Sequence, residues 1–90
     1  MERVHIKVFG YVQGVLYRSN AADVAERLGL SGWVKNVPDG GVEIISEGEK
    51  EALEALIDWC QKGPEFAKVE NVDVEWSVPT GEFKSFEVRF

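Results

Sequence analysis

Apolar and polar residues alternate over several short stretches of the chain, which is typical of strands with one buried face. In residues 3–9, for example, Val4, Ile6 and Val8 alternate with polar residues. Such alternation, or an apolar run next to turn residues such as PDGG, predicts strands at residues 3–9, 31–37, 41–45 and 72–78. The last ten residues, GEFKSFEVRF, can add a short fifth strand.

Two other segments carry apolar residues at helical spacing. In the first, Ala21, Val24, Ala25 and Leu28 share one face, and Gly29 follows as a typical helix-ending glycine. The second is strongly amphipathic, and its apolar face consists of Ala52, Leu53, Leu56, Ile57, Trp59 and Cys60. We expect it to end at Gly63-Pro64, because proline cannot continue the backbone hydrogen bonds of a helix.

These elements follow one another in the order β-α-β-β-α-β, with a small addition at the end. Two amphipathic helices and strands with one wet face indicate two layers. The sequence therefore predicts an α+β, ferredoxin-like sandwich, with both helices on one face of a four- to five-stranded antiparallel sheet. With 90 residues and no repeat or linker, we expect a single domain over residues 1–90.

Composition and charge exclude several classes of partner. The net charge of −6 argues against general binding to nucleic acids or anionic membranes, which requires a basic face. No run approaches the roughly 20 apolar residues of a membrane span, and the N-terminus does not resemble a signal peptide. The lone Cys60 excludes an internal disulfide and favours a reducing compartment. We therefore expect a cytoplasmic monomer.

Few residues offer catalytic chemistry. His5 and Cys60 are the only residues of their types and lie far apart, so no metal-ligand spacing is present. His5 falls on the polar side of a strand, and Cys60 falls on the apolar face of a helix, where packing is its ordinary role. Ser19 and Ser31 have no evident histidine partner for a catalytic triad. We expect no metal and no cofactor.

The loop GYVQGVLYR, residues 10–18, joins the first strand to the first helix and suits an anion. Residues 1–20 contain three basic side chains and one acidic one, whereas the rest of the chain is strongly acidic. The free N–H groups at a helix N-terminus bind anions with help from the helix dipole. Gly10 and Gly14 allow such amides to converge, and Arg18 adds a forked cation suited to phosphate. Taken alone, the loop could be a simple turn and Arg18 a solvated helix residue.

Asn36 is the second candidate. It ends the second predicted strand just before PDGG, at a position where asparagine is a poor strand former. In a ferredoxin-like sandwich this strand end and the first loop can face one pocket, and an amide can hold a water molecule in one orientation. The ordinary alternative is an asparagine that initiates the turn.

Together, GYVQGVLYR and GWVKNVPDGGVEIISEG resemble the two signature segments of the acylphosphatase family, and the resemblance extends over essentially the whole chain. It implies that Arg18 and the loop amides bind the phosphate of an acyl phosphate. It implies that Asn36 orients the attacking water, which releases a carboxylate and inorganic phosphate without a metal. The implied loop residues are Tyr11, Val12, Gln13, Gly14, Val15, Leu16 and Tyr17.

The chain departs from the family at two neighbouring positions, where Leu16-Tyr17 replaces the usual Gly-Phe. Leucine adds a branched side chain beside the anion site and adopts positive φ with difficulty. Two alternatives stay open. A non-catalytic module that binds acyl or carbamoyl phosphate is favoured by Leu16. A ferredoxin-like RNA-binding domain is disfavoured by Asp73, Glu75 and Glu87, which we expect on the open face of the sheet.

Overall fold

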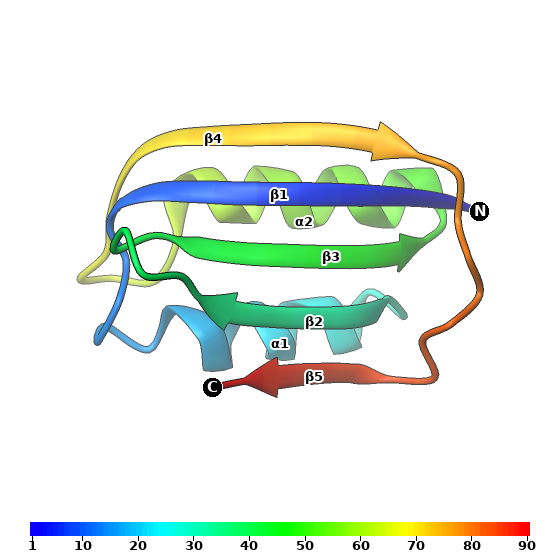
Figure 1. Ribbon diagram of the computed structural model, residues 1–90, viewed down its shortest axis with the longest axis horizontal. Helices are drawn as coiled ribbons and strands as arrows, with labels where there is room; N and C mark the ends of the chain where they lie inside the picture. The colour runs from blue at the N-terminus through cyan, green and yellow to red at the C-terminus, as the bar shows by residue number, and fades with distance from the viewer.

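A computed structural model describes residues 1–90 and shows two helices packed against one sheet (Figure 1). In chain order the elements are β1 (Glu2–Tyr11), α1 (Tyr17–Arg27), β2 (Ser31–Asn36), β3 (Val42–Gly48), α2 (Lys50–Lys62), β4 (Lys68–Ser77) and β5 (Phe86–Arg89). Every predicted strand and helix is present, although β4 begins four residues earlier than the alternation of its side chains indicated. No helix is long and apolar enough to cross a membrane.

The five strands lie in the order β4-β1-β3-β2-β5. The pairs β1–β3, β1–β4 and β2–β3 are antiparallel, as predicted. β5 instead runs parallel to β2, so the sheet is mixed rather than wholly antiparallel. The cause is the β4–β5 connection, which passes from one edge of the sheet to the other at the end where β4 finishes (Figure 1). β5 therefore starts and finishes at the same ends of the sheet as β2.

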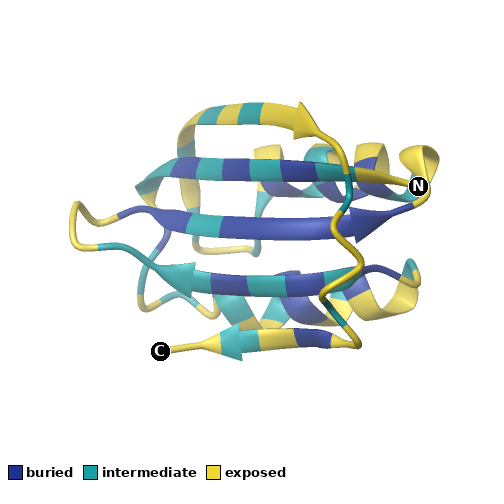
Figure 2. Cartoon of the chain, turned by 45° about the vertical axis from the view of Figure 1, so that its right-hand side comes forward, coloured by how far each residue is buried: buried dark blue, intermediate teal, exposed yellow.

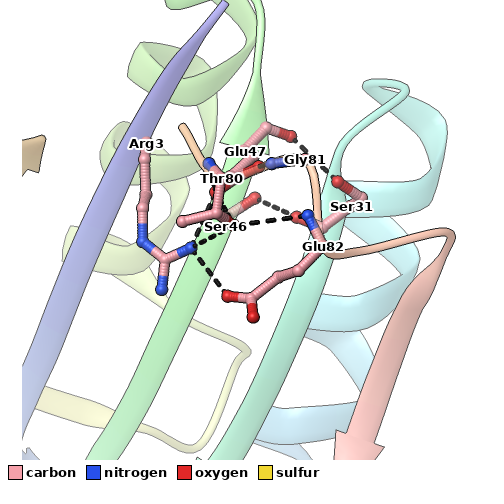
Figure 3. A network of polar contacts seen from close by, with 7 residues as sticks. All are labelled: Arg3, Ser31, Ser46, Glu47, Thr80, Gly81 and Glu82. Carbon is pink, nitrogen blue, oxygen red and sulfur yellow. Dashed lines mark hydrogen bonds and ion pairs between the residues drawn. The ribbon is translucent and has the colours of Figure 1, made fainter. Parts of the chain in front are cut away.

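The β4–β5 connection is fixed by a buried carboxylate, Glu47, at the end of β3 (Figure 3). Glu47 accepts hydrogen bonds from Arg3 Nη1 at 2.7 Å, from the Thr80 N–H at 2.8 Å and from the Gly81 N–H at 3.0 Å. Burial alone would raise the pKa of Glu47, but these donors lower it from 4.5 to about 2. The carboxylate therefore stays charged and holds the connection over the end of β3.

The hydrophobic core lies between the helices and the sheet. The alternation predicted for β1 is confirmed, since Val4, Ile6 and Val8 are fully buried. The apolar face of α2 is likewise confirmed, because Leu53, Leu56 and Cys60 have no exposed surface. Figure 2 shows that the central strand β3 is buried along nearly its whole length, whereas β4 and the β4–β5 connection are largely exposed.

The first helix is anchored at both of its ends. At its C-terminus, Gly29 has φ 74° and donates to the Glu26 carbonyl, while Leu30 donates to the Ala25 carbonyl, so the predicted glycine ending is confirmed. At its N-terminus, the Tyr17 hydroxyl donates to the Cys60 carbonyl at 2.8 Å. This bond ties the first turn of α1 to the last turn of α2, and so fixes the helix end that faces the candidate site.

Candidate active site

A pocket of about 270 Å³ opens where the loop before α1 meets the ends of β2 and β5. These three segments come together at the same end of the sheet (Figure 1). The pocket is lined by Val12, Gly14, Leu16, Tyr17, Arg18, Ser19, Asn36, Val88 and Phe90. The structure thus brings Arg18 and Asn36 to one pocket. None of the lining side chains is acidic, so the positive charge of Arg18 is available to an anion.

The loop uses glycine where the backbone demands it. Gly10 has φ 131°, and a Cβ at this position would lie 2.1 Å from the Lys68 carbonyl oxygen on β4. Gly14 follows with φ 75°, and Leu16 precedes the helix with φ 64°. A left-handed residue next to right-handed ones turns successive N–H groups toward one side, which is how backbone nests bind anions. The free N–H groups of the first turn of α1 continue this arrangement.

Leu16 is the only residue other than glycine with a positive φ. This conformation costs about 1–2 kcal/mol for a residue with a Cβ. Its carbonyl accepts hydrogen bonds from the Asn20 N–H at 3.2 Å, from Asn20 Nδ2 at 2.8 Å and from Ser19 Oγ at 3.3 Å. The backbone of Leu16 is thus strained, as expected for a leucine with a positive φ. The hydrogen bonds from the first turn of α1 to its carbonyl hold this conformation.

Gln13 connects the loop to the turn that follows Asn36. Its Nε2 donates to the Val37 carbonyl at 2.7 Å and to the Gly41 carbonyl at 2.8 Å. These two bonds span the β2–β3 turn and fix the loop relative to the end of β2. The side chain of Gln13 is therefore committed to the protein, and only its backbone is left for a ligand.

Arg18 is positioned by the residues that end β5. Its Nη1 donates to the Arg89 carbonyl at 2.9 Å, and the guanidinium lies 4.6 Å from the centre of the Phe90 ring. An arginine has five N–H donors, so four remain for a bound anion. The charge and donors of Arg18 are thus directed by contacts that use only part of its capacity.

Asn36 has a buried oxygen atom without a hydrogen-bond partner. Its Oδ1 is inaccessible to solvent and accepts no hydrogen bond from the protein. Nearly all buried polar atoms in proteins do have a partner, so an exception calls for an explanation. Asn36 itself lines the pocket beside Arg18, so its amide is placed to meet the O–H of a water molecule or a ligand there.

The predicted loop residues divide into two groups. Val12, Gly14, Leu16 and Tyr17 line the pocket, whereas Tyr11, Gln13 and Val15 do not. Tyr11 still belongs to β1, and Val15 packs against the core. Sequence reasoning missed three lining residues, Ser19, Val88 and Phe90. The sequence allowed a short strand near the end of the chain, but no signal in it identified β2 as the neighbour of that strand.

Two buried titratable side chains, Tyr17 in the pocket wall and its neighbour Cys60, have raised pKa values. Burial raises the pKa of the Cys60 thiol to about 12, so the thiol is not a nucleophile at neutral pH. The packing role predicted for Cys60 agrees with its complete burial. Burial also raises the pKa of Tyr17, whose neutral hydroxyl holds the bond to the Cys60 carbonyl. A phenylalanine at this position would lack that bond.

Known proteins resemble this chain over its whole length. Residues 4–88 match the family model described as Acylphosphatase. An acylphosphatase from Methylococcus capsulatus is 52% identical over 88 residues, which cover 98% of this chain and 96% of that protein. The crystal structure of acylphosphatase from Bacillus subtilis is similar with a TM-score of 0.96, at 36% identity and with full coverage of both chains. The chain therefore belongs to the acylphosphatase family.

The predicted ferredoxin-like fold and the predicted acylphosphatase enzyme class are confirmed with the family. The same fold also occurs inside a much longer protein. HypF from T. kodakarensis is similar with a TM-score of 0.84 at 34% identity, and this chain covers only 12% of it.

Proposed function

We propose that this enzyme hydrolyses the carboxyl–phosphate bond of acyl phosphates in the pocket that holds Arg18 and Asn36. The observation that carries the proposal is that one pocket holds Arg18, which has no carboxylate partner, and Asn36, whose Oδ1 has no hydrogen-bond partner. Arg18 suits the phosphate, and Asn36 Oδ1 suits a water molecule. Both lie beside the loop that joins β1 to α1.

The phosphate is bound by the amides of the loop and by Arg18. The loop contains the left-handed residues Gly14 and Leu16, and it leads into the N-terminus of α1. Amides and guanidinium together stabilise charge on the phosphoryl oxygens, and they need no rearrangement during the reaction. One preorganised donor of this kind contributes about 2.7–4 kcal/mol in comparable sites.

The water is held by Asn36 and attacks phosphorus in line with the acyl oxygen. The bond from the water oxygen to phosphorus forms, and the bond from phosphorus to the acyl oxygen breaks. The carboxylate leaves with the bonding electron pair, and the protons of the water pass to the inorganic phosphate. A carboxylate is a stable anion at neutral pH, so the reaction depends on positioning rather than on a general acid.

We propose further that the reaction needs no metal or cofactor. The nine lining residues include no histidine, cysteine, aspartate or glutamate, so the usual ligands for a divalent cation are missing from the site. The charge of Arg18 and the loop amides fulfil the role that a metal has in many phosphoryl-transfer enzymes.

The test is hydrolysis of benzoyl phosphate in EDTA, with inorganic phosphate as a competitive inhibitor. We expect Arg18→Ala to weaken phosphate inhibition and to lower turnover by about 100-fold or more. We expect Asn36→Ala to keep phosphate inhibition and to lose turnover to a similar extent. Arg27→Ala, on the exposed last turn of α1, is the matched control and should leave both unchanged.

Two other outcomes would change the assignment. If the wild-type protein binds phosphate but hydrolyses nothing, the chain is the binding module that Leu16 favours. If Asn36→Ala retains full activity, the water-positioning role is wrong. An RNA-binding function has little support, because His5 on the open sheet face lies 2.6 Å from Glu43 and 4.0 Å from Glu75.

We propose that the enzyme acts as a cytoplasmic monomer. One chain supplies every residue of the pocket, and the only cysteine is buried and unpaired. Sedimentation at micromolar concentration, with and without phosphate, tests the monomer.

A further inference from the structure

We propose that Leu16 and Phe90 form an apolar wall that receives the acyl group, so that the enzyme prefers substrates with a bulky apolar or aromatic acyl group. This inference rests on the proposed function of the pocket. The acyl group is the part of the substrate that Arg18, Asn36 and the loop amides leave unbound.

The walls of the pocket separate into a polar part and an apolar part. Five of its nine lining residues are hydrophobic: Val12, Leu16, Tyr17, Val88 and Phe90. Val12 and Tyr17 are each 1% exposed and belong to the core, and Val88 is half-buried. Leu16 is 73% exposed and Phe90 is fully exposed, so these two offer most of the free apolar surface beside the pocket.

Leu16 contributes little to the packing of the fold. It is not part of the hydrophobic core and does not pack against it. It also holds a strained left-handed backbone that glycine would adopt freely. Strained residues that the fold does not need gather at ligand sites. We therefore assign the Leu16 side chain to a contact with the substrate.

Phe90 lines the pocket directly beside Arg18. One face of its ring covers the Arg18 guanidinium at 4.6 Å, and the ring is otherwise in solvent. If Arg18 binds the phosphate, the ring lies next to the group joined to that phosphate. The reacting water approaches on the side opposite the acyl oxygen, so Asn36 and the acyl group do not compete for space.

The size of the effect follows from apolar burial. A pocket gains about 10-fold or more in discrimination for each methylene-sized contact that it makes with one substrate and not with another. Benzoyl phosphate extends past the phosphate site as a flat ring, whereas acetyl phosphate carries a single methyl group. We expect the apolar wall to act on the first and hardly on the second.

The experiment compares kcat/KM for benzoyl and acetyl phosphate in the wild-type enzyme and in Leu16→Asn. Asparagine tolerates the left-handed conformation best among residues with a Cβ, and it matches leucine in size. The variant therefore changes polarity with little change in backbone. We expect the benzoyl-to-acetyl ratio to fall by about 10-fold in Leu16→Asn, whatever the change in absolute rate, and to fall again when Phe90→Ala is added.

Val78→Ala is the matched control, because Val78 is 81% exposed on the β4–β5 connection at the other end of the sheet. Its ratio should equal that of the wild type. An unchanged ratio in Leu16→Asn, with both substrates still hydrolysed, would overturn the apolar wall and leave the proposed function standing. Wild-type enzyme that hydrolyses neither substrate would overturn both.

Discussion

Two side chains with buried oxygen atoms lie at opposite ends of the same pair of strands, β2 and β3. Glu47, which pairs with Ser31, is 1% exposed and accepts four hydrogen bonds, from Arg3, Gly81 and twice from Thr80 (Figure 3). Asn36, which pairs with Val42, has a buried Oδ1 that accepts none from the protein. One end of the strand pair is fully satisfied, and the other is not.

The difference in hydrogen bonding between Glu47 and Asn36 indicates that one residue serves stability and the other serves function. A buried carboxylate with every partner in place holds its neighbours, whereas a buried acceptor without a partner costs about 1–3 kcal/mol. We therefore expect the Glu47 end of the sheet to determine the stability of the fold. We expect the unpartnered acceptor at the Asn36 end to lower the stability of the fold and to serve the reaction.

The largest effect on stability should come from Glu47→Ala. The change leaves the Thr80 and Gly81 amides without their acceptor and should lower the free energy of unfolding by about 3 kcal/mol. Glu82→Ala is the control, because Glu82 also binds Arg3 but is half exposed, and it should cost less than about 1 kcal/mol. Urea unfolding at constant m-value measures both, and similar losses in the two variants would contradict the special role of Glu47.

The same carboxylate should also control stability in acid. Because the pKa of Glu47 is lowered from 4.5 to about 2 in the folded state, its contribution is complete above about pH 4.5 and is lost as the pH falls towards 2. The difference in unfolding free energy between the wild type and Glu47→Gln should therefore be constant near neutral pH and should shrink below pH 4.5. Urea unfolding of both proteins from pH 7 to pH 2 tests this, and a difference independent of pH would show that Glu47 does not titrate in this range.

The contrast between these two ends was only partly accessible from the sequence. The motifs predicted Arg18 and Asn36 as site residues, and the apolar patterns together with the turn residues predicted the helices and strands. Glu47 could not be distinguished from a solvated strand residue, because the segment that covers it lies more than 30 residues later in the chain. The parallel partner of β5 was missed for the same reason, since pairing between distant segments leaves no local pattern.

Leu16 shows a different limit of sequence reasoning. Leucine makes a positive φ unlikely, and the usual glycine is absent, so the sequence alone argued against the conformation that the structure contains. The conformation is set by Asn20 and Ser19, whose side chains hold the Leu16 carbonyl, and by the start of α1. Hydrogen bonds from the first turn of α1 thus outweigh the backbone preference of leucine at this position.

A smaller effect is expected at Tyr17, which lines the pocket and joins the two helices. Tyr17→Phe removes the hydrogen bond to the Cys60 carbonyl and leaves that acceptor without a partner, so it should cost about 1 kcal/mol of unfolding free energy. Tyr11→Phe is the matched control, because Tyr11 is exposed, and it should cost nothing measurable. An equal stability of the two variants would show that the bond between α1 and α2 adds nothing to the fold.

A still smaller effect, of the opposite sign, is expected at Leu16. Leu16→Gly relieves a strain of about 1–2 kcal/mol, and the greater freedom of glycine in the unfolded chain offsets about 0.5–1 kcal/mol of this gain. The variant should therefore be about 0.5 kcal/mol more stable than the wild type, measured as an increase in the urea midpoint. A clear loss of stability would mean that the Leu16 side chain packs against the protein rather than serving a ligand.

The smallest change in stability should come from Asn36→Ala, although this variant should lose activity. The substitution removes a buried acceptor that no protein group satisfies, so the lost packing and the relieved desolvation nearly cancel, and we expect a change within about 0.5 kcal/mol. Glu47→Ala also replaces a buried polar side chain with a methyl group, but it should unfold far more easily and should retain turnover while folded. If Asn36→Ala were as destabilising as Glu47→Ala, then Asn36 would be a structural residue, and its loss of activity would say nothing about a bound water.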